Sequence, residues 1–136
     1  YMAILSADFV TRFRDHIINI HPSLLPDLKG LDTHARALAE GRSTHGATVH
    51  IVTPLLDDGP ILLQAALTIT ADETEAELAA RVLKLEHALY PFVIMALASG
   101  DLHIVGGVPR WQQGERALGK ADDSIASILH PVVIWP

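Results

Sequence analysis

An amide and an imidazole lie two residues apart in the stretch Asn19-Ile20-His21-Pro22-Ser23. The apolar run before it predicts a buried strand, which must end at His21-Pro22 because proline lacks a backbone donor. Alternate side chains of a strand point the same way, so Asn19 and His21 share one face at the strand's carboxyl end, where ligands bind in open α/β sheets. Together they could hold a carbonyl oxygen as it becomes an oxyanion. The alternative is a turn-forming Asn and a strand-end His, both satisfied by backbone groups.

A second group of interest is the loop Leu56-Asp57-Asp58-Gly59-Pro60. Glycine and proline permit a tight turn that presents one carboxylate. If that carboxylate lay near His21, it would favour the protonated imidazole. Adjacent aspartates in a loop are more often solvated turn residues, so this signal is weak when taken alone.

The segment His45-Gly46-Ala47-Thr48-Val49-His50 places Thr48 and His50 on one strand face. Two histidines and a carboxylate, here His21, His50 and Asp57, could in principle bind zinc or iron. The chain has no compact ligand motif of the HxxxH kind, so no metal is predicted. His50 and Thr48 are instead interpreted as supporting partners of the site, or His50 as a satisfied core histidine.

The elements that would position these residues follow from hydrophobic spacing and capping residues. The predicted strands are Ile17–Ile20, Ala47–Thr53, Ile61–Ile69 and a short edge strand at Leu102–Val105. The first predicted helices are Ala7–His16, with Phe9, Val10 and Phe13 inward, and a short helix from Asp32 or Thr33 to Glu40. Strands alternate with helices, which favours the α/β class.

A long helix is predicted after the third strand, with Asp72 and Glu75 as a capping-box pair at its start and Gly100 at its end. Pro91 is expected to kink or divide it, because proline removes one backbone hydrogen bond. Its apolar stripe follows the helical period and consists of Leu78, Val82, Leu85, Leu89, Phe92 and Ala96.

Composition narrows the function classes. The 136 residues are 49% hydrophobic and 19% charged, which is typical of a globular domain and not of a disordered chain. The net charge of −6 argues against nucleic acid as a partner. The absence of cysteine excludes a disulfide framework and a thiolate nucleophile. The apolar stretch Ala88–Ala98 is too short to span a membrane, so no membrane partner is expected.

In tandem, these motifs resemble a known family. Asn19–Pro26 and Leu56–Pro60 resemble the two hallmarks of the 10-formyltetrahydrofolate formyltransferases, in the expected order and separation. The segments between them, Gly30–His34 and Thr44–His50, resemble the members that act on glycinamide ribonucleotide. The resemblance covers about residues 1–107.

The resemblance implies transfer of a formyl group from 10-formyltetrahydrofolate, as cosubstrate, to the amine of glycinamide ribonucleotide in purine synthesis. The implied catalytic residues are Asn19, His21 and Asp57. Asn19 and protonated His21 would hold the formyl oxygen, and Asp57 would assist proton movement to the leaving nitrogen. The implied folate-binding residues are Met2, Ala3, Ile4, Leu5, Asn19, Thr53, Pro54, Leu55, Leu56 and Asp57. Glu86 matches a residue that contacts the ribonucleotide.

The implied fold is the C-terminal part of a Rossmann-like formyltransferase: a mixed, mostly parallel sheet flanked by helices. Residues 1–115 would form the catalytic part and residues 116–136 a tail packing on it. The N-terminal portion of such enzymes, with its phosphate-binding loop, is absent from this chain, so pairing with that portion or a homo-oligomer is expected. A formyltetrahydrofolate hydrolase, or an inactive fragment, remains the alternative. Relatives of this kind imply a cytoplasmic location.

Overall fold

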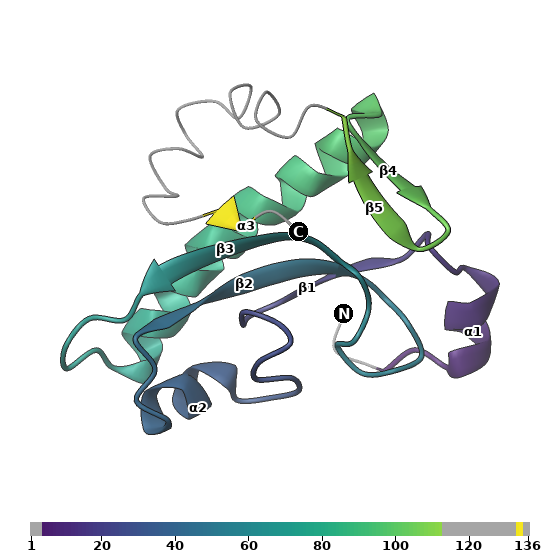
Figure 1. Ribbon diagram of the computed structural model, residues 1–136. Helices are drawn as coiled ribbons and strands as arrows, with labels where there is room; N and C mark the ends of the chain where they lie inside the picture. Colours follow the sequence, from purple (N-terminus) through teal and green to yellow (C-terminus); the bar gives the residue numbers. More distant parts are fainter. Residues whose placement is uncertain (1–3, 113–132, 135–136) are drawn as a thin grey trace.

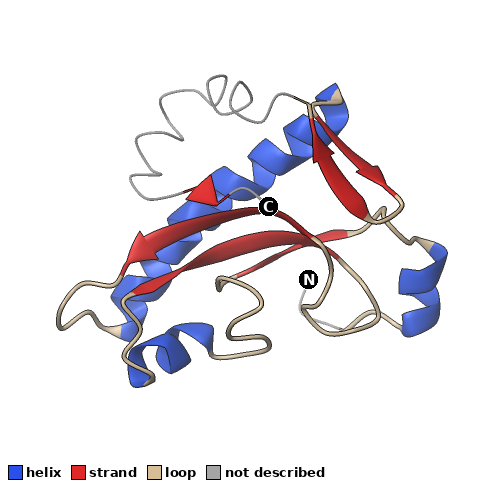
Figure 2. Cartoon of the chain, in the orientation of Figure 1, coloured by secondary structure: helices blue, strands red, loops and turns tan. Residues whose placement is uncertain are grey.

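The fold is a sheet with one long helix packed across its apolar face. The computed structural model describes residues 4–112 and 133–134. The sheet has the strand order β1 (Ile18–His21), β2 (Thr44–Ile51), β3 (Ile61–Thr68) and β6 (Val133–Ile134). The helix α3 (Glu75–Ser99) runs behind β2 and β3, and β6 brings part of the C-terminal tail to the sheet (Figures 1 and 2). The expected α/β class is confirmed.

The direction of the strands differs from the expectation. Each pairing in the described part of the main sheet is antiparallel. A second, separate sheet is an antiparallel hairpin of β4 (Leu102–Val105) and β5 (Val108–Trp111), so the expected edge strand pairs only with its neighbour. The prediction of mostly parallel pairing is therefore wrong for these strands. Parallel neighbours need a crossover of about a dozen residues or more, and the loop between β2 and β3 is too short to supply one.

The apolar face of the sheet and the inner face of α3 form the core. On the strands, alternate residues such as Ala47, Val49 and Ile51 are fully buried. The buried residues of α3 are Leu78, Val82, Leu85, Leu89, Val93 and Ala96. Each such aliphatic side chain contributes about 1.5–3 kcal/mol when removed from water, except for the smaller alanine.

The long helix differs from its prediction at two places. Its N-cap is Thr74, which forms a capping box with Glu77, so the predicted Asp72 and Glu75 pair is wrong. Val93 takes the inward position predicted for Phe92, whose ring lies partly buried and stacks on Trp111 with centroids 6.0 Å apart. Both residues fit between the buried Leu89 and Ala96, because a period of 3.6 residues allows a step of either three or four along one face.

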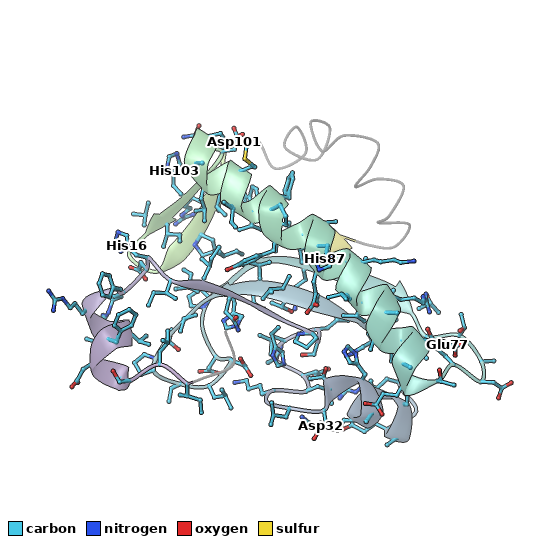
Figure 3. All side chains as sticks on the ribbon, turned by 180° about the vertical axis from the view of Figure 1, so that it is seen from behind. His16, Asp32, Glu77, His87, Asp101 and His103 are labelled. Carbon is cyan, nitrogen blue, oxygen red and sulfur yellow. The ribbon has the colours of Figure 1, made fainter. Side chains whose placement is uncertain are left out.

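Pro91 lies inside α3 without dividing it, and Gly100 ends the helix in a left-handed conformation as predicted. By length and composition alone, α3 could cross a membrane, and it is the one such helix in the described residues. That is weak evidence, because the core helix of a globular protein passes the same test and six residues of α3 are buried. Figure 3 shows α3 from behind, with the labelled His87 on it.

The first helix is shorter than predicted. α1 spans Ala7–Arg12, begins at the capping side chain of Ser6 and buries only Val10. Phe9 and Phe13 are 46% and 42% exposed and pack on each other with ring centroids 4.7 Å apart. The prediction that both face inward is wrong, because residues four apart share one face of a helix and Val10 points about 100° away from it.

A short helix and a histidine pair hold the segment after β1. α2 spans Thr33–Ala39, and its N-cap Asp32 makes no capping hydrogen bond with its side chain. The Thr33 hydroxyl donates to the Pro22 carbonyl over 2.6 Å. His34 Nδ1 and the buried His45 Nε2 are 3.1 Å apart, so one shared hydrogen bond connects α2 to β2. Burial, followed by the charges of His34, Arg42 and His21, lowers the pKa of His45 to about 4.

The other face of the sheet is polar and anchors the loop 22–30. The buried Thr48 hydroxyl donates to Ser23 O over 2.7 Å and accepts from Leu25 N over 3.1 Å. Gln64, which pairs with Thr48 across β2 and β3, donates to Thr48 Oγ1 and to Leu25 O, both over 2.8 Å. These bonds hold the loop, whose Leu25 and Leu28 are also buried, because the strands beneath it present hydrogen-bonding side chains.

Replacing Thr48 with Val should remove this anchor while keeping the side chain's shape. The backbone groups of Ser23 and Leu25 would lose their buried partner, so we expect a loss of about 1–3 kcal/mol of unfolding free energy in urea titration. Thr44→Val, on the same strand but at an exposed position, is the matched control and should change little. Equal effects of the two variants would contradict the anchoring role.

The buried His45 should make stability fall in mild acid. The unfolded chain binds a proton at the ordinary pKa of 6.5, whereas folded His45 resists it down to about 4. The unfolded state therefore holds more protons in that interval, and the unfolding free energy should drop as the pH falls through it. His45→Asn should flatten this slope in pH-dependent denaturation, and the exposed His103→Asn should not. An unchanged slope in His45→Asn would show that the lowered pKa is wrong.

Candidate functional site

The predicted polar residues do meet on one face of the sheet. In the register of β1 and β2, Asn19 pairs with His50 and His21 pairs with Thr48. Directly opposed residues point to the same side, so all four share one face. This confirms the prediction that Asn19 and His21 share one strand face. His21, Thr48 and His50 are buried, and Asn19 is exposed.

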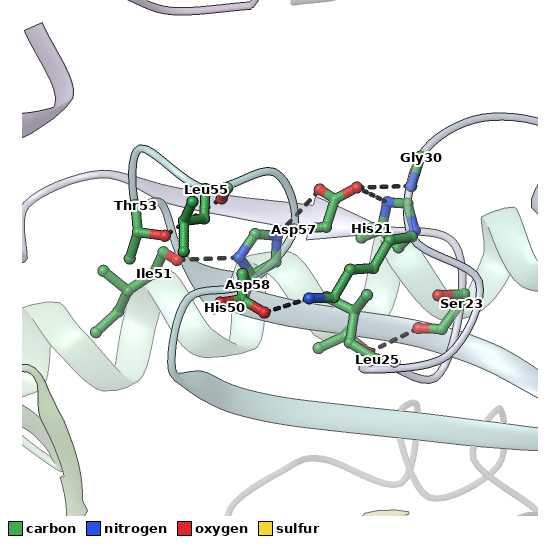
Figure 4. A network of polar contacts seen from close by, with 12 residues as sticks. His21, Ser23, Leu25, Gly30, His50, Ile51, Thr53, Leu55, Asp57 and Asp58 are labelled. Carbon is green, nitrogen blue, oxygen red and sulfur yellow. Dashed lines mark hydrogen bonds and ion pairs between the residues drawn. The ribbon is translucent and has the colours of Figure 1, made fainter. Parts of the chain in front are cut away.

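A carboxylate completes this group. The loop after β2 places Asp57 between two imidazoles: its Oδ2 lies 3.5 Å from His21 Nδ1 and its Oδ1 lies 3.8 Å from His50 Nε2 (Figure 4). The backbone N–H of Gly30 donates to Oδ2 over 2.9 Å. The Asp57 side chain is 9% exposed. A carboxylate so far removed from water needs such donors to remain ionised.

His21 is held in one tautomer. Its Nε2 lies 2.8 Å from the carbonyl oxygen of Leu28, a contact that is buried. A carbonyl can only accept, so Nε2 must carry the hydrogen, and the Nδ1 of the neutral ring turns a lone pair toward Asp57. Both nitrogens of His21 therefore face protein groups. A ligand oxygen must take the place of the Leu28 carbonyl to receive this donor.

His50 is held in the opposite tautomer by the same logic. Its Nδ1 donates to the carbonyl of Ile51 over 3.0 Å. Its Nε2 is buried and has no hydrogen-bond partner, and no other buried side-chain nitrogen or oxygen of the described residues lacks one. Burial lowers the pKa of His50, the Ile51 carbonyl and Asp57 act against this, and the charge of His21 lowers it further. The ring is therefore neutral at neutral pH.

The loop that carries Asp57 depends on a glycine. A Cβ at Gly59 would lie 1.6 Å from the Ile51 carbonyl oxygen, the same atom that fixes the His50 tautomer. Asp57 has a φ of 47°, a left-handed conformation that aspartate tolerates better than most residues. The neighbouring Asp58 points away and pairs with Lys29 near the surface. The two aspartates of the motif thus have different environments.

The expected folate residues have mixed placements. Met2 and Ala3 lie outside the described residues. Ile4, Leu55 and Leu56 are 88%, 67% and 61% exposed, so their apolar side chains stand free on the surface. Leu5 and Thr53 are half-buried and Pro54 is exposed. A common folate site formed by these residues stays a prediction.

Glu86 lies on α3, a different element from those that carry His21 and Asp57. It is half-buried on α3, and burial raises the pKa of its carboxyl, with the charge of His87 acting the other way. It precedes by one turn Tyr90, whose hydroxyl donates to Ile18 O, so it lies beside the edge strand β1. Its contact with the ribonucleotide substrate stays a prediction.

Within residues 4–112 and 133–134, no group of three His, Asp or Glu side chains is arranged to hold a metal ion. The reading of His21, His50 and Asp57 as metal ligands therefore finds no support in their arrangement. What these residues can do is hold and move protons beside an amide, Asn19.

Sequence reasoning missed the groups that orient this site. The carbonyl of Leu28 and the N–H of Gly30 are backbone groups, which no residue type reveals. Gln64 was detectable as the single polar residue in the apolar run of β3. The pairing of His34 with His45 could not be recognised from the sequence, because the two rings come close only through the docking of α2 onto β2.

Comparisons with known proteins identify the family of this chain. The formyl transferase family matches residues 1–94. The phosphoribosylglycinamide formyltransferase of Escherichia coli (strain K12) is 45% identical over 116 residues, which are 85% of this chain and 54% of that protein. The chain spans about half the length of the curated relatives it matches.

Solved structures give the same result. The phosphoribosylglycinamide formyltransferase from Anaplasma phagocytophilum superposes with a TM-score of 0.80 at 38% identity, covering 84% of this chain and 56% of that one. A formyltetrahydrofolate deformylase from Pseudomonas syringae pv. tomato superposes with a TM-score of 0.76 at 25% identity, covering 82% and 37%. Fold, motif order and family match all agree: the chain belongs to the formyl transferase family.

Proposed function

We propose that this chain carries the catalytic residues of a transferase that moves a formyl group from 10-formyltetrahydrofolate to the amine of glycinamide ribonucleotide. The observation that carries this is the position of Asp57, buried against His21 at the end of β1 with Asn19 on the same face. Several similar proteins are named phosphoribosylglycinamide formyltransferase, which supports the choice of acceptor. The folate donor and a cytoplasmic location follow from the same resemblance.

In the proposed reaction, Asn19, His21 and Asp57 stabilise charge and move a proton as the formyl group is transferred. The amine attacks the formyl carbon, and the carbonyl oxygen gains negative charge. Asn19 and the Nε2–H of His21 donate to that oxygen, which replaces the Leu28 carbonyl. When the C–N bond to the folate breaks, the proton lost by the attacking nitrogen reaches the leaving nitrogen through Asp57 and a water. No covalent enzyme intermediate forms in this scheme.

The remaining parts of the substrates are assigned to other segments. The exposed Ile4, Leu55 and Leu56 offer apolar surface to a flat ring, and Glu86 is the residue proposed to contact the ribonucleotide. The phosphate is left for a segment beyond this chain or for a second copy, since the chain corresponds to about half of its relatives.

Hydrolysis of formyltetrahydrofolate is the second candidate. Two deformylases share the fold with TM-scores of 0.76 and 0.71. The same three residues would serve, with water in place of the amine. The identity of the chain to these two structures is 25% and 27%, against 38% and 42% for two of the transferases, which favours transfer.

The direct test follows conversion of 10-formyltetrahydrofolate to tetrahydrofolate by absorbance, with and without glycinamide ribonucleotide. Turnover that requires the ribonucleotide supports the transferase. Turnover that proceeds equally without it supports the hydrolase. A chain that gives neither, even at high substrate, would contradict activity of the chain alone and support a catalytic half that needs its N-terminal portion.

The adjacent aspartates supply a matched pair of variants. Asp57→Asn removes the carboxylate charge between the two imidazoles and should lower kcat about a hundredfold or more. Asp58→Asn alters only the surface pair with Lys29 and should retain nearly full turnover. Steady-state kinetics of both variants decide the matter, and similar losses in the two would refute a special role for Asp57.

A further inference from the structure

The starting observation is that both imidazoles beside Asp57 have already committed their hydrogen. His21 donates through Nε2 to the Leu28 carbonyl, and His50 donates through Nδ1 to the Ile51 carbonyl. Their remaining nitrogens both face the Asp57 carboxylate. With both rings neutral and Asp57 ionised, three acceptors face one another and no hydrogen lies between them.

The distances from Asp57 to the two rings are those expected when no hydrogen lies between the carboxylate and either imidazole nitrogen. Separations of 3.5 Å and 3.8 Å exceed the 2.7–3.2 Å of an N–H···O hydrogen bond. One added proton would complete the arrangement on either side: on His21 Nδ1 it bonds Oδ2, and on His50 Nε2 it bonds Oδ1. Both placements leave the three residues with zero net charge. Moving the proton from one ring to the other therefore does not change the total charge that is buried.

We propose that His21, Asp57 and His50 hold one shared proton, and that His50 is its alternative holder. His50 is thus a positioning residue: it acts through Asp57 on the fraction of His21 that is protonated. This inference deepens the proposed function and rests on it for its role in the reaction. It explains why a buried nitrogen, His50 Nε2, is left without a partner.

The surroundings of His50 limit its share of the proton. Two titratable groups face it, Asp57 from the loop after β2 and His21 from β1. Its register partners, Asn19 on β1 and Ile61 on β3, carry no charge. The next carboxylate, Asp58, is paired with Lys29. Burial and the His21 charge disfavour protonated His50, and the Ile51 carbonyl and the Asp57 charge favour it, so the net lowering of its pKa limits its share of the proton.

The test is a pH titration of the full chain labelled with ¹⁵N-histidine, followed by NMR. The expected result is that His21 Nδ1 and His50 Nε2 shift upfield together, at one common midpoint, each by part of the change of a full protonation. An unchanged His50 Nε2 throughout the His21 transition would overturn the proposal. This readout needs no turnover, so it stands or fails separately from the proposed function.

Two variants sharpen the titration. In His50→Gln the amide can donate to Asp57 Oδ1 but cannot take a proton, so the His21 shift should grow to that of a complete single-site protonation. In Asp57→Asn the connection between the rings is lost, and His50 should no longer follow His21. His103→Gln is the matched control and should leave both signals as in the parent chain. A His21 shift of unchanged size in His50→Gln would contradict proton sharing.

Discussion

Burial of one carboxylate, Asp57, is the constraint on which the site depends. A carboxylate removed from water is unstable unless donors or positive charge surround it. Here Gly30 supplies a backbone N–H, and one nitrogen of each of two imidazoles faces the carboxylate at 3.5 Å and 3.8 Å, where a proton on either ring would supply the positive charge. The left-handed backbone of Asp57 and the absence of a side chain at Gly59 allow the loop to place the carboxylate between the two imidazoles.

The sheet satisfies this constraint by dividing its two faces between stability and chemistry. Alternate residues of β2 either pack under α3, as Val49 does, or face the site, as Thr48 and His50 do. Thr48 and Gln64 hold the loop 22–30, whose backbone orients His21 and Asp57. The site thus rests on strands fixed by the core, which gives its side chains little freedom to move.

The sequence was sufficient for the parts that depend on residue type and short spacing. Asn19, His21 and Asp57 were identified from their motifs, and the strand-face argument placed Thr48 and His50 beside them. Sequence reasoning failed where the structure depends on how the chain folds in three dimensions. Strand direction is set by how distant segments dock, and the backbone partners of both imidazoles are set by the local path of the main chain. The identity of the residues does not reveal these features.

His21 and His50 each commit one hydrogen to a backbone carbonyl and turn the other ring nitrogen toward the same carboxylate. Neutron diffraction from crystals of the chain in deuterated solvent at neutral pH would locate these hydrogens directly. The account predicts deuterium on His21 Nε2, toward the Leu28 carbonyl, and on His50 Nδ1, toward the Ile51 carbonyl. It further predicts at most partial occupancy between either ring and Asp57. Deuterium on His50 Nε2 with Nδ1 bare would contradict the account.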